Sequence, residues 1–170
     1  GSFPTSYIPT TTAAVTRAAD SAVMTGGNFS SWYRSDELTV FVDRISPAYS
    51  VVEEKDIVKL HDGTGNNFFS LRVVGGGTQS LDATVRSAGA VQVDSNNPAC
   101  AANLVHKHAS ALKANDFADS INGAAVFSDS SVTVPALNQM TIGGSGAGWF
   151  RKIQAYPKRL SNAKLQAMTV

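Results

Sequence analysis

The sequence predicts an all-β protein, an antiparallel β-sandwich or jelly roll that ends in one short helix. Short strand-like runs recur along it, with turn-forming residues roughly every eight to twelve positions. Almost no stretch has the 3.6-residue periodicity of an amphipathic helix. No linker or internal repeat divides the 170 residues, so we expect a single domain over residues 1–170.

The expected elements follow in chain order, and most strands alternate apolar with polar residues, as strands with one buried face do. Residues 1–12 are rich in Pro and Thr and are expected to form an extended N-terminal arm, which could add a strand to a partner's sheet edge. Strands are then expected at Leu38–Ile45, Ile57–His61, Phe68–Val74, Leu81–Arg86, Ala90–Val93, Leu104–Leu112, Phe117–Ile121, Ala124–Phe127, Gln139–Ile142 and Trp149–Tyr156.

Two local signals mark a turn and a helix start. Asn122-Gly123 favours a type I′ hairpin, because both central residues of that turn need positive φ. Ser161 is a good N-cap, and Leu160 with Leu165 fits the hydrophobic staple that accompanies such caps. We therefore expect a short C-terminal helix that is held by its contacts with a sheet, since a helix this short is marginal alone.

The composition excludes several classes of function. Charged residues make up 16% of the chain and the net charge is +1, with no basic stripe, so no nucleic-acid partner is expected. Cys100 is the only cysteine, which excludes an intrachain disulfide and a thiolate metal cluster. No apolar run has the length of a membrane span, so no membrane insertion is expected.

The histidine pair His106 and His108 is the weak candidate for a metal site. On a strand, residues two apart face the same way and could bind one ion. Ala109–Lys113 contains no acid to complete such a site, so two ordinary strand histidines are the preferred interpretation. Residues that could still join them in space are His61, Asp116 and Asp119.

Two acidic segments are candidates for catalysis and for calcium binding. Glu54 and Asp56 match the first positions of the Glu-x-Asp-x-x-Glu strand of retaining glucanases, but Lys59 replaces the second essential carboxylate. No Gly-x-Ser-x-Gly motif, P-loop or Rossmann fingerprint is present either, so we predict that the protein is not an enzyme. The loop Asp62–Asn67 offers few oxygens for calcium, so we expect a hairpin loop and no cofactor, with calcium as the alternative.

Aromatic residues at loop–strand junctions are the candidates for carbohydrate binding. Trp32 and Tyr33 follow the loop Gly26–Ser31, and Trp149 follows Gly143–Gly148. Aromatic rings can stack on the apolar faces of sugars while keeping a polar edge in water. The alternative for each tryptophan is burial in the core.

Several segments resemble a group of bacteriophage tail and virion domains that have the concanavalin A-like (laminin-G-like) jelly roll. The C-terminal stretch Gly143–Val170 has that group's strand, Tyr-Pro, Arg-Leu-Ser and Leu-Gln-Ala-Met-Thr. Thr5–Thr10 (TSYIPT) and Thr16–Asp20 (TRAAD) are similar to its opening, and Lys107–Val126 is similar to its central hairpin.

The resemblance implies a non-enzymatic virion module, a tail fibre or spike domain for host-surface (carbohydrate) attachment. The alternative is a structural capsid or tail decoration protein that binds neighbouring virion subunits. The implied partners are a bacterial surface glycan or other virion proteins, and tail modules of this kind imply a homotrimer. The implied location is the virion, made in the bacterial cytoplasm and extracellular after release.

Overall fold

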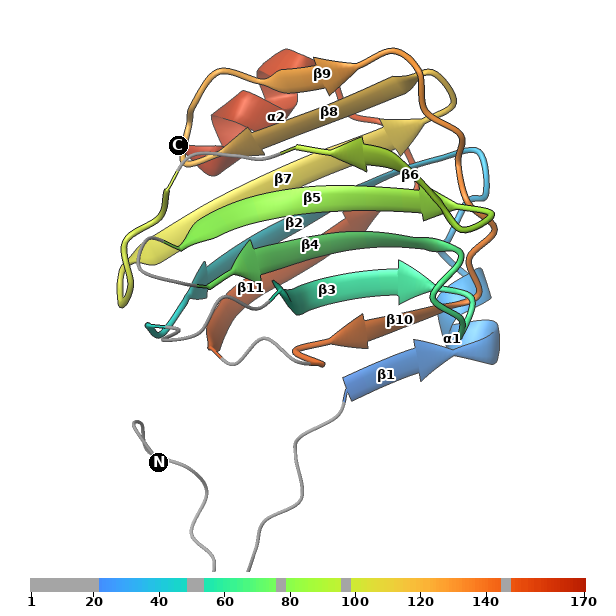
Figure 1. Ribbon diagram of the computed structural model, residues 1–170, viewed down its shortest axis with the longest axis horizontal. Coiled ribbons are helices and arrows are strands. Elements are labelled where there is room, and N and C mark those ends of the chain that lie inside the picture. Colours follow the sequence, from blue (N-terminus) through green and yellow to red (C-terminus); the bar gives the residue numbers. More distant parts are fainter. Residues whose placement is uncertain (1–21, 49–53, 76–78, 96–98, 145–147) are drawn as a thin grey trace, which may run out of the picture.

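The protein is a sandwich of two antiparallel sheets, as its sequence predicts (Figure 1). The computed structural model describes residues 22–48, 54–75, 79–95, 99–144 and 148–170. One sheet has six strands in the order β1-β10-β3-β4-β5-β6, and the other has five in the order β11-β2-β7-β8-β9. The arm predicted over residues 1–12 lies outside the described residues.

The bounds of most strands lie close to the predicted ones. The six-stranded sheet consists of β1 (Ala22–Thr25), β10 (Gln139–Ile142), β3 (Glu54–His61), β4 (Phe68–Val74), β5 (Ser80–Ser87) and β6 (Ala90–Asp94). The five-stranded sheet consists of β11 (Trp149–Tyr156), β2 (Glu37–Ile45), β7 (Val105–Lys113), β8 (Asp116–Ile121) and β9 (Phe127–Asp129). The two helices of the described residues are α1 (Gly26–Ser30) and α2 (Asn162–Thr169).

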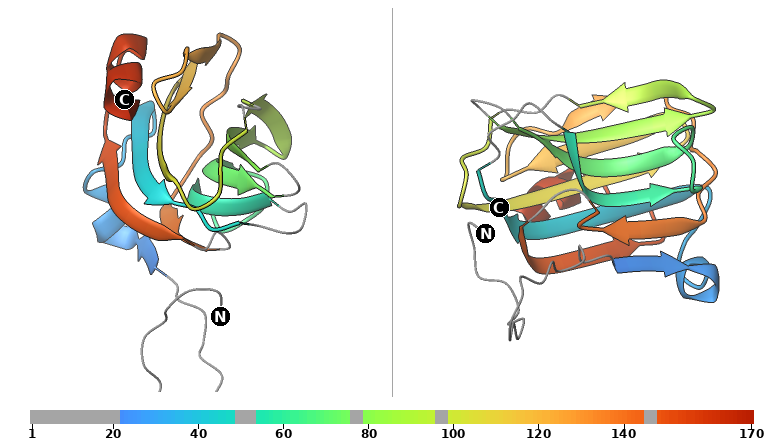
Figure 2. Two further views of the ribbon diagram at one scale, coloured as in Figure 1. Left: turned by 90° about the vertical axis from the view of Figure 1, so that its left-hand side faces the viewer. Right: turned by 60° about the horizontal axis from the view of Figure 1, so that its bottom comes forward.

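Alternation along each strand places one set of side chains between the sheets. The core between them includes Leu38, Val40, Val42, Leu60, Phe69, Leu71, Val73, Leu81, Ala83, Val85, Leu112 and Phe117, all at most 1% exposed. Helix α2 lies against the outer side of the five-stranded sheet (Figure 2, left). Neither described helix has the length and apolar composition needed to cross a membrane.

The predicted strand Ala124–Phe127 is wrong, although the turn before it is confirmed. Asn122 and Gly123 both have positive φ, and the Ala124 N–H donates to the Ile121 carbonyl, as a type I′ turn requires. The Ala124 carbonyl then accepts a hydrogen bond from the Ser120 hydroxyl instead of joining the ladder. The chain therefore leaves the sheet after the turn and pairs again only from Phe127.

The first described strand and helix were not predicted. β1 follows directly on residues outside the described part, and α1 occupies much of the segment expected to be a loop, Gly26–Ser31. Gly26 and Gly27 have low helix propensity, so the sequence signal is weak. The buried Phe29 anchors this helix in the core.

Candidate functional site

The outer face of the six-stranded sheet carries rows of polar side chains that the strand register brings into line. Gln139 lies opposite both Thr25 and His61, His61 lies opposite Phe68, and Phe68 lies opposite Arg86. One row therefore crosses five neighbouring strands, over about 19 Å at the usual strand spacing. A second row runs beside it through Thr141, Lys59, Ser70 and Thr84.

A hollow of about 420 Å³ opens on this face where the loop between β3 and β4 leaves the sheet. Its lining contains charged, hydroxyl and glycine residues from three segments, including Asp56, Lys59, His61, Thr64, Thr141 and Gly144. Charged and polar groups close to one another in a concave surface are typical of sites that bind small polar ligands.

Lys59 is the cation of the hollow. Its ammonium lies 3.0 Å from Asp56 Oδ2 and 4.4 Å from the centre of the Phe68 ring. The other Asp56 oxygen accepts a hydrogen bond from the Ser70 hydroxyl. A second cation, Arg86, lies 5.5 Å from the same Phe68 ring. This partly buried ring thus lies close to two positive charges, an arrangement that cation–π attraction favours.

His61 has a defined protonation state in the hollow. The Gly63 N–H donates to His61 Nδ1, so Nδ1 carries no proton and Nε2 donates to the Thr141 hydroxyl 3.0 Å away. Burial lowers the pKa of His61, and the charge of Lys59 lowers it further. The imidazole is therefore neutral at pH 7, with its proton on Nε2.

The loop Asp62–Asn67 is the hairpin loop that its sequence predicts. Asp62 Oδ1 accepts hydrogen bonds from the Thr64 N–H and hydroxyl, and Oδ2 accepts one from the Asn67 amide. These hydrogen bonds, those of Thr64 first, hold the pKa of Asp62 at about 2. The carboxylate thus orders the wall of the hollow.

The acidic segment compared with the glucanase strand is engaged in ion pairs. Glu54 lies 2.6 Å from Arg72, whose guanidinium also lies 3.0 Å from Asp94 and 3.9 Å from the buried Asp82. Asp56 is bound by Lys59 and Ser70, as described above. The two carboxylates that match the glucanase pattern therefore each contact a cation.

The predicted aromatic residues lie in two separate places. Trp32 and Tyr33 pack around Phe29 at the α1 end of the sandwich, with the Phe29 and Tyr33 rings stacked at 4.6 Å. The Trp32 indole donates to the sulfur of Met24. Both side chains are partly buried against the core, and Tyr33 borders a second hollow of about 550 Å³.

Trp149 does not join this cluster. It is 41% exposed and lies opposite Ile45, at the end of β2 farthest from Glu37. Nine residues of extended β2 separate these ends by about 26 Å. The three aromatic residues therefore cannot bind one small ligand together.

His106 and His108 face the same way, as predicted, but they point into the sandwich. His108 Nε2 lies 2.7 Å from Asp119 Oδ1, which also accepts a hydrogen bond from the Ser110 hydroxyl. His106 Nε2 donates to the Ala101 carbonyl at 2.6 Å. These hydrogen bonds form a network in the interior of the sandwich. Among the described residues no three His, Cys, Asp or Glu side chains form a metal-binding group.

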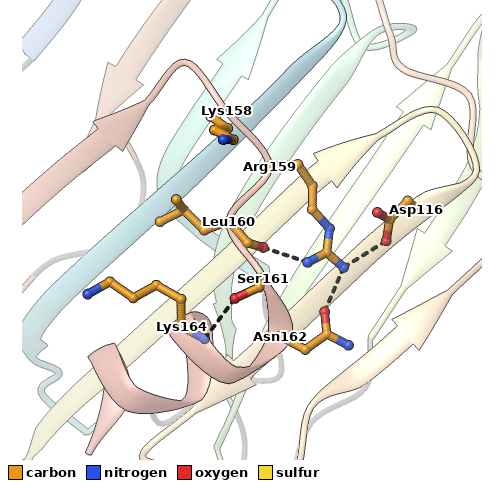
Figure 3. Close-up of a pocket in the computed structure, with 7 residues that line it drawn as sticks. All are labelled: Asp116, Lys158, Arg159, Leu160, Ser161, Asn162 and Lys164. Carbon is orange, nitrogen blue, oxygen red and sulfur yellow. Dashed lines mark hydrogen bonds and ion pairs between the residues drawn. The ribbon is translucent and has the colours of Figure 1, made fainter.

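A larger hollow, of about 840 Å³, lies beside the start of α2 (Figure 3). Its central cation is Arg159, which donates to Asp116 and Asn162, both at 2.7 Å, and to the Leu160 carbonyl. Most of the guanidinium is thus used to join β8 to α2. In Figure 3 the side chain of Lys164 points away from that of Arg159, so the charges do not converge on one point.

Sequence reasoning missed the hollow on the six-stranded sheet. It considered His61 only as a possible addition to a metal site, and it did not consider Thr141 or Phe68. The outward alternation of β3, β4 and β10 is visible in the sequence. The contact of His61 with Thr141, 80 positions away, is not visible in the sequence.

The fold has known relatives in structure, while no family model and no curated protein matches the sequence. The CBM40 domain of the Ruminococcus gnavus IT-sialidase superposes with a TM-score of 0.61 at 14% identity, over 79% of this chain and 83% of that one. The same domain bound to alpha2,3 sialyllactose gives 0.55 at 13% identity, with the same coverage. Domain 4 of the arabinanase AbnA from Geobacillus stearothermophilus, in complex with arabinotriose, gives 0.64 at 15%, over 80% of this chain and 68% of that one. These likenesses show the jelly-roll fold of the chain.

Proposed function

We propose that this domain is a non-catalytic carbohydrate-binding module. The observation that carries the proposal is the hollow on the outer face of the six-stranded sheet. It offers the Lys59 ammonium, the Thr141 hydroxyl and the neutral His61, with the Phe68 ring beside them. Sugars combine hydroxyl groups with apolar ring faces, so a polar hollow next to an aromatic ring matches their chemistry.

Two further observations support this function. Structures with the same fold have been solved with sialyllactose and with arabinotriose bound. The carboxylate in the lining of the hollow, Asp56, is held by Lys59 and Ser70. A retaining glycosidase instead needs two carboxylates about 5 Å apart on opposite sides of the bond to be cleaved.

We further propose that the ligand is a bacterial surface glycan and that the domain belongs to a phage tail fibre or spike. This part of the proposal rests on the sequence resemblance of Thr5–Thr10, Thr16–Asp20 and the C-terminal stretch to phage virion domains. A hollow beside a surface loop suits attachment to a polymer on a cell surface, because binding residues often lie on loops.

The test is a binding screen of the purified domain on bacterial surface polysaccharides and a glycan array. Phe68→Ala is expected to weaken binding at least tenfold, and Phe127→Ala, an exposed phenylalanine of the other sheet, is expected to leave it unchanged. Circular dichroism checks that each variant is folded. If no glycan binds, the function is wrong. If Trp32→Ala or Trp149→Ala abolishes binding and Phe68→Ala does not, the site lies at the aromatic residues instead.

A structural role in the virion is the second candidate, and one surface feature favours it. Trp149 and Val105 both lie opposite Ile45 on the five-stranded sheet, and each is 41% exposed. Leu104 beside them is 58% exposed. Neighbouring exposed apolar residues are typical of protein contacts. Saturable binding to assembled particles, lost in a Trp149→Ser variant and without any glycan binding, would establish this role.

A further inference from the structure

We propose that the hollow on the six-stranded sheet selects an acidic sugar, whose carboxylate lies between the Lys59 ammonium and the Thr141 hydroxyl. This inference rests on the proposed carbohydrate-binding function and specifies its ligand class. It follows from which polar groups of the hollow are already used within the protein and which remain for a ligand.

The acceptors of the hollow are engaged by the protein itself. Asp56 accepts from Lys59 through one oxygen and from Ser70 through the other. His61 Nδ1 accepts the Gly63 N–H. The Thr64 hydroxyl accepts a hydrogen bond from the Asn66 N–H and donates one to Asp62. Each of these side-chain acceptors thus already holds a hydrogen bond within the protein, which favours a ligand that accepts hydrogen bonds.

Lys59 and Thr141 carry the side-chain donors that remain for a ligand. An ammonium has three N–H groups, and one of those on Lys59 is directed to Asp56. The Thr141 hydroxyl oxygen accepts a hydrogen bond from His61 Nε2–H. Its own O–H donates to no acceptor among the described residues. The neutral His61 thus orients Thr141 as a donor toward the open side of the hollow.

The two donors are neighbours. Thr141 and Lys59 lie directly opposite each other in the pairing of β10 with β3, and both side chains are on the outer face. Opposite side chains in an antiparallel pair have Cβ atoms about 5 Å apart. Both side chains line the same hollow, so a carboxylate bound there can accept from the Thr141 hydroxyl and from the Lys59 ammonium, whose hydrogen bond is charge-assisted and of the stronger kind.

The local charge also favours an acid over a neutral sugar. Asp56 offsets the charge of Lys59. Arg86, which lies opposite Phe68 on the neighbouring strand β5, forms no ion pair among the described residues. The Lys59 side chain is only 26% exposed, so its field is less screened than that of a fully exposed lysine. An anionic ligand would add the missing negative charge.

The experiment compares sugars that differ only in the acid. Titration calorimetry or NMR would measure sialyllactose against lactose and methyl glucuronide against methyl glucoside, on the whole chain at low salt. In at least one pair the acid is expected to bind about tenfold or more tightly, and this preference should shrink in 0.5 M NaCl because salt screens the charge.

Variants then locate the carboxylate. Lys59→Met keeps the aliphatic stem and is expected to lower affinity for the acid about tenfold, a clearly larger loss than for the neutral sugar of the pair. Thr141→Val keeps the shape of the side chain without its hydroxyl and is expected to lower affinity for the acid severalfold. Lys152→Met, an exposed lysine of the five-stranded sheet, is the matched control. Melting curves verify that each variant is folded.

The outcomes separate this inference from the proposed function. Equal binding of both members of every pair would overturn the acid preference and leave carbohydrate binding intact. An acid preference that survives in both Lys59→Met and Thr141→Val would place the carboxylate elsewhere and overturn the inference as well. Absence of binding to every glycan tested would end both proposals together.

Discussion

The outer faces of the two sheets have the same strand alternation but opposite surroundings. On the five-stranded sheet the outward residues Ala109, Ala111 and Ala118 are small, and Leu165 of α2 lies buried among them. On the six-stranded sheet the outward positions include long charged side chains such as Lys59 and Arg72, and α2 packs on the strands of the other sheet. The small outward side chains of the five-stranded sheet thus leave room for α2, whereas the long charged ones of the six-stranded sheet form ion pairs on its surface.

The covered face also has a polar connection to the chain end. The Thr39 hydroxyl donates to the Lys158 carbonyl and accepts the Leu160 N–H. Glu37 accepts the N–H of Arg159, whose guanidinium reaches Asp116. These bonds satisfy the backbone between β11 and α2, so the segment can lie on the sheet without leaving buried polar groups unpaired.

The largest expected effect comes from removing the apolar anchor of the covered face. Leu165→Ala should lower the free energy of unfolding by about 3 kcal/mol, because it leaves a cavity above three alanines that cannot fill it. Urea denaturation would measure the loss. Met168→Ala, a partly buried neighbour on the same helix, should cost clearly less. Equal losses for the two would mean that α2 is held by general contact and not by one anchor.

The second largest effect is expected from the ion pairs of Arg72 on the six-stranded sheet. Arg72→Met should cost about 2 kcal/mol, since Asp82 is 2% exposed and would lose its nearby cation. The pairs with the more exposed Glu54 and Asp94 should add little. Arg151→Met removes a 53% exposed arginine from the other sheet and should change stability by less than about 0.5 kcal/mol. A similar loss in both variants would contradict this distinction.

In the interior of the sandwich, the hydrogen-bond network of Asp119 should make stability depend on pH. Burial alone opposes ionisation of Asp119, but His108 and the hydrogen bonds from His108, Ser110 and Ser95 outweigh it and lower its pKa. The resulting stabilisation is complete above the unfolded value, near 4, and is lost as the pH falls through the lower folded value.

Melting temperatures from pH 7 to pH 3 would show this dependence. Asp119→Asn should reduce the decline and should itself cost about 2 kcal/mol at pH 7, because the carboxylate that accepts two buried hydrogen bonds is replaced. A variant that declines as steeply as the wild type would assign the acid sensitivity to other carboxylates.

The smallest effect concerns the cap of α2. Ser161 accepts the Lys164 N–H, so Ser161→Ala should cost about 1 kcal/mol. Lys164→Glu should instead raise the free energy of unfolding by about 0.3–0.5 kcal/mol, because it completes the capping box and places an anion at the helix N-terminus. Thermal denaturation would measure both. A destabilised Lys164→Glu variant would show that the lysine has a contact of its own.

Local features of the sequence were sufficient for most elements. The alternation of β2 and β5, the Asn122-Gly123 turn and the Ser161 cap each depend on neighbouring residues, and each is found in the structure. The misplaced strand after Asn122-Gly123 failed because the Ser120 side chain binds the Ala124 carbonyl. Strand propensity does not show which side chain will bind a given backbone carbonyl.

The sequence by itself determined that the chain is a β-sandwich with a C-terminal helix, because periodicity and turn chemistry act over a few residues. Only the tertiary structure decided which of its polar residues meet. Whether His106 and His108 face the interior, and whether Lys59 and His61 meet Thr141 from a distant strand, depends on strand pairing and register. Register is set by burial of the whole apolar face, since a shift of one residue would exchange the inner and outer side chains of a strand.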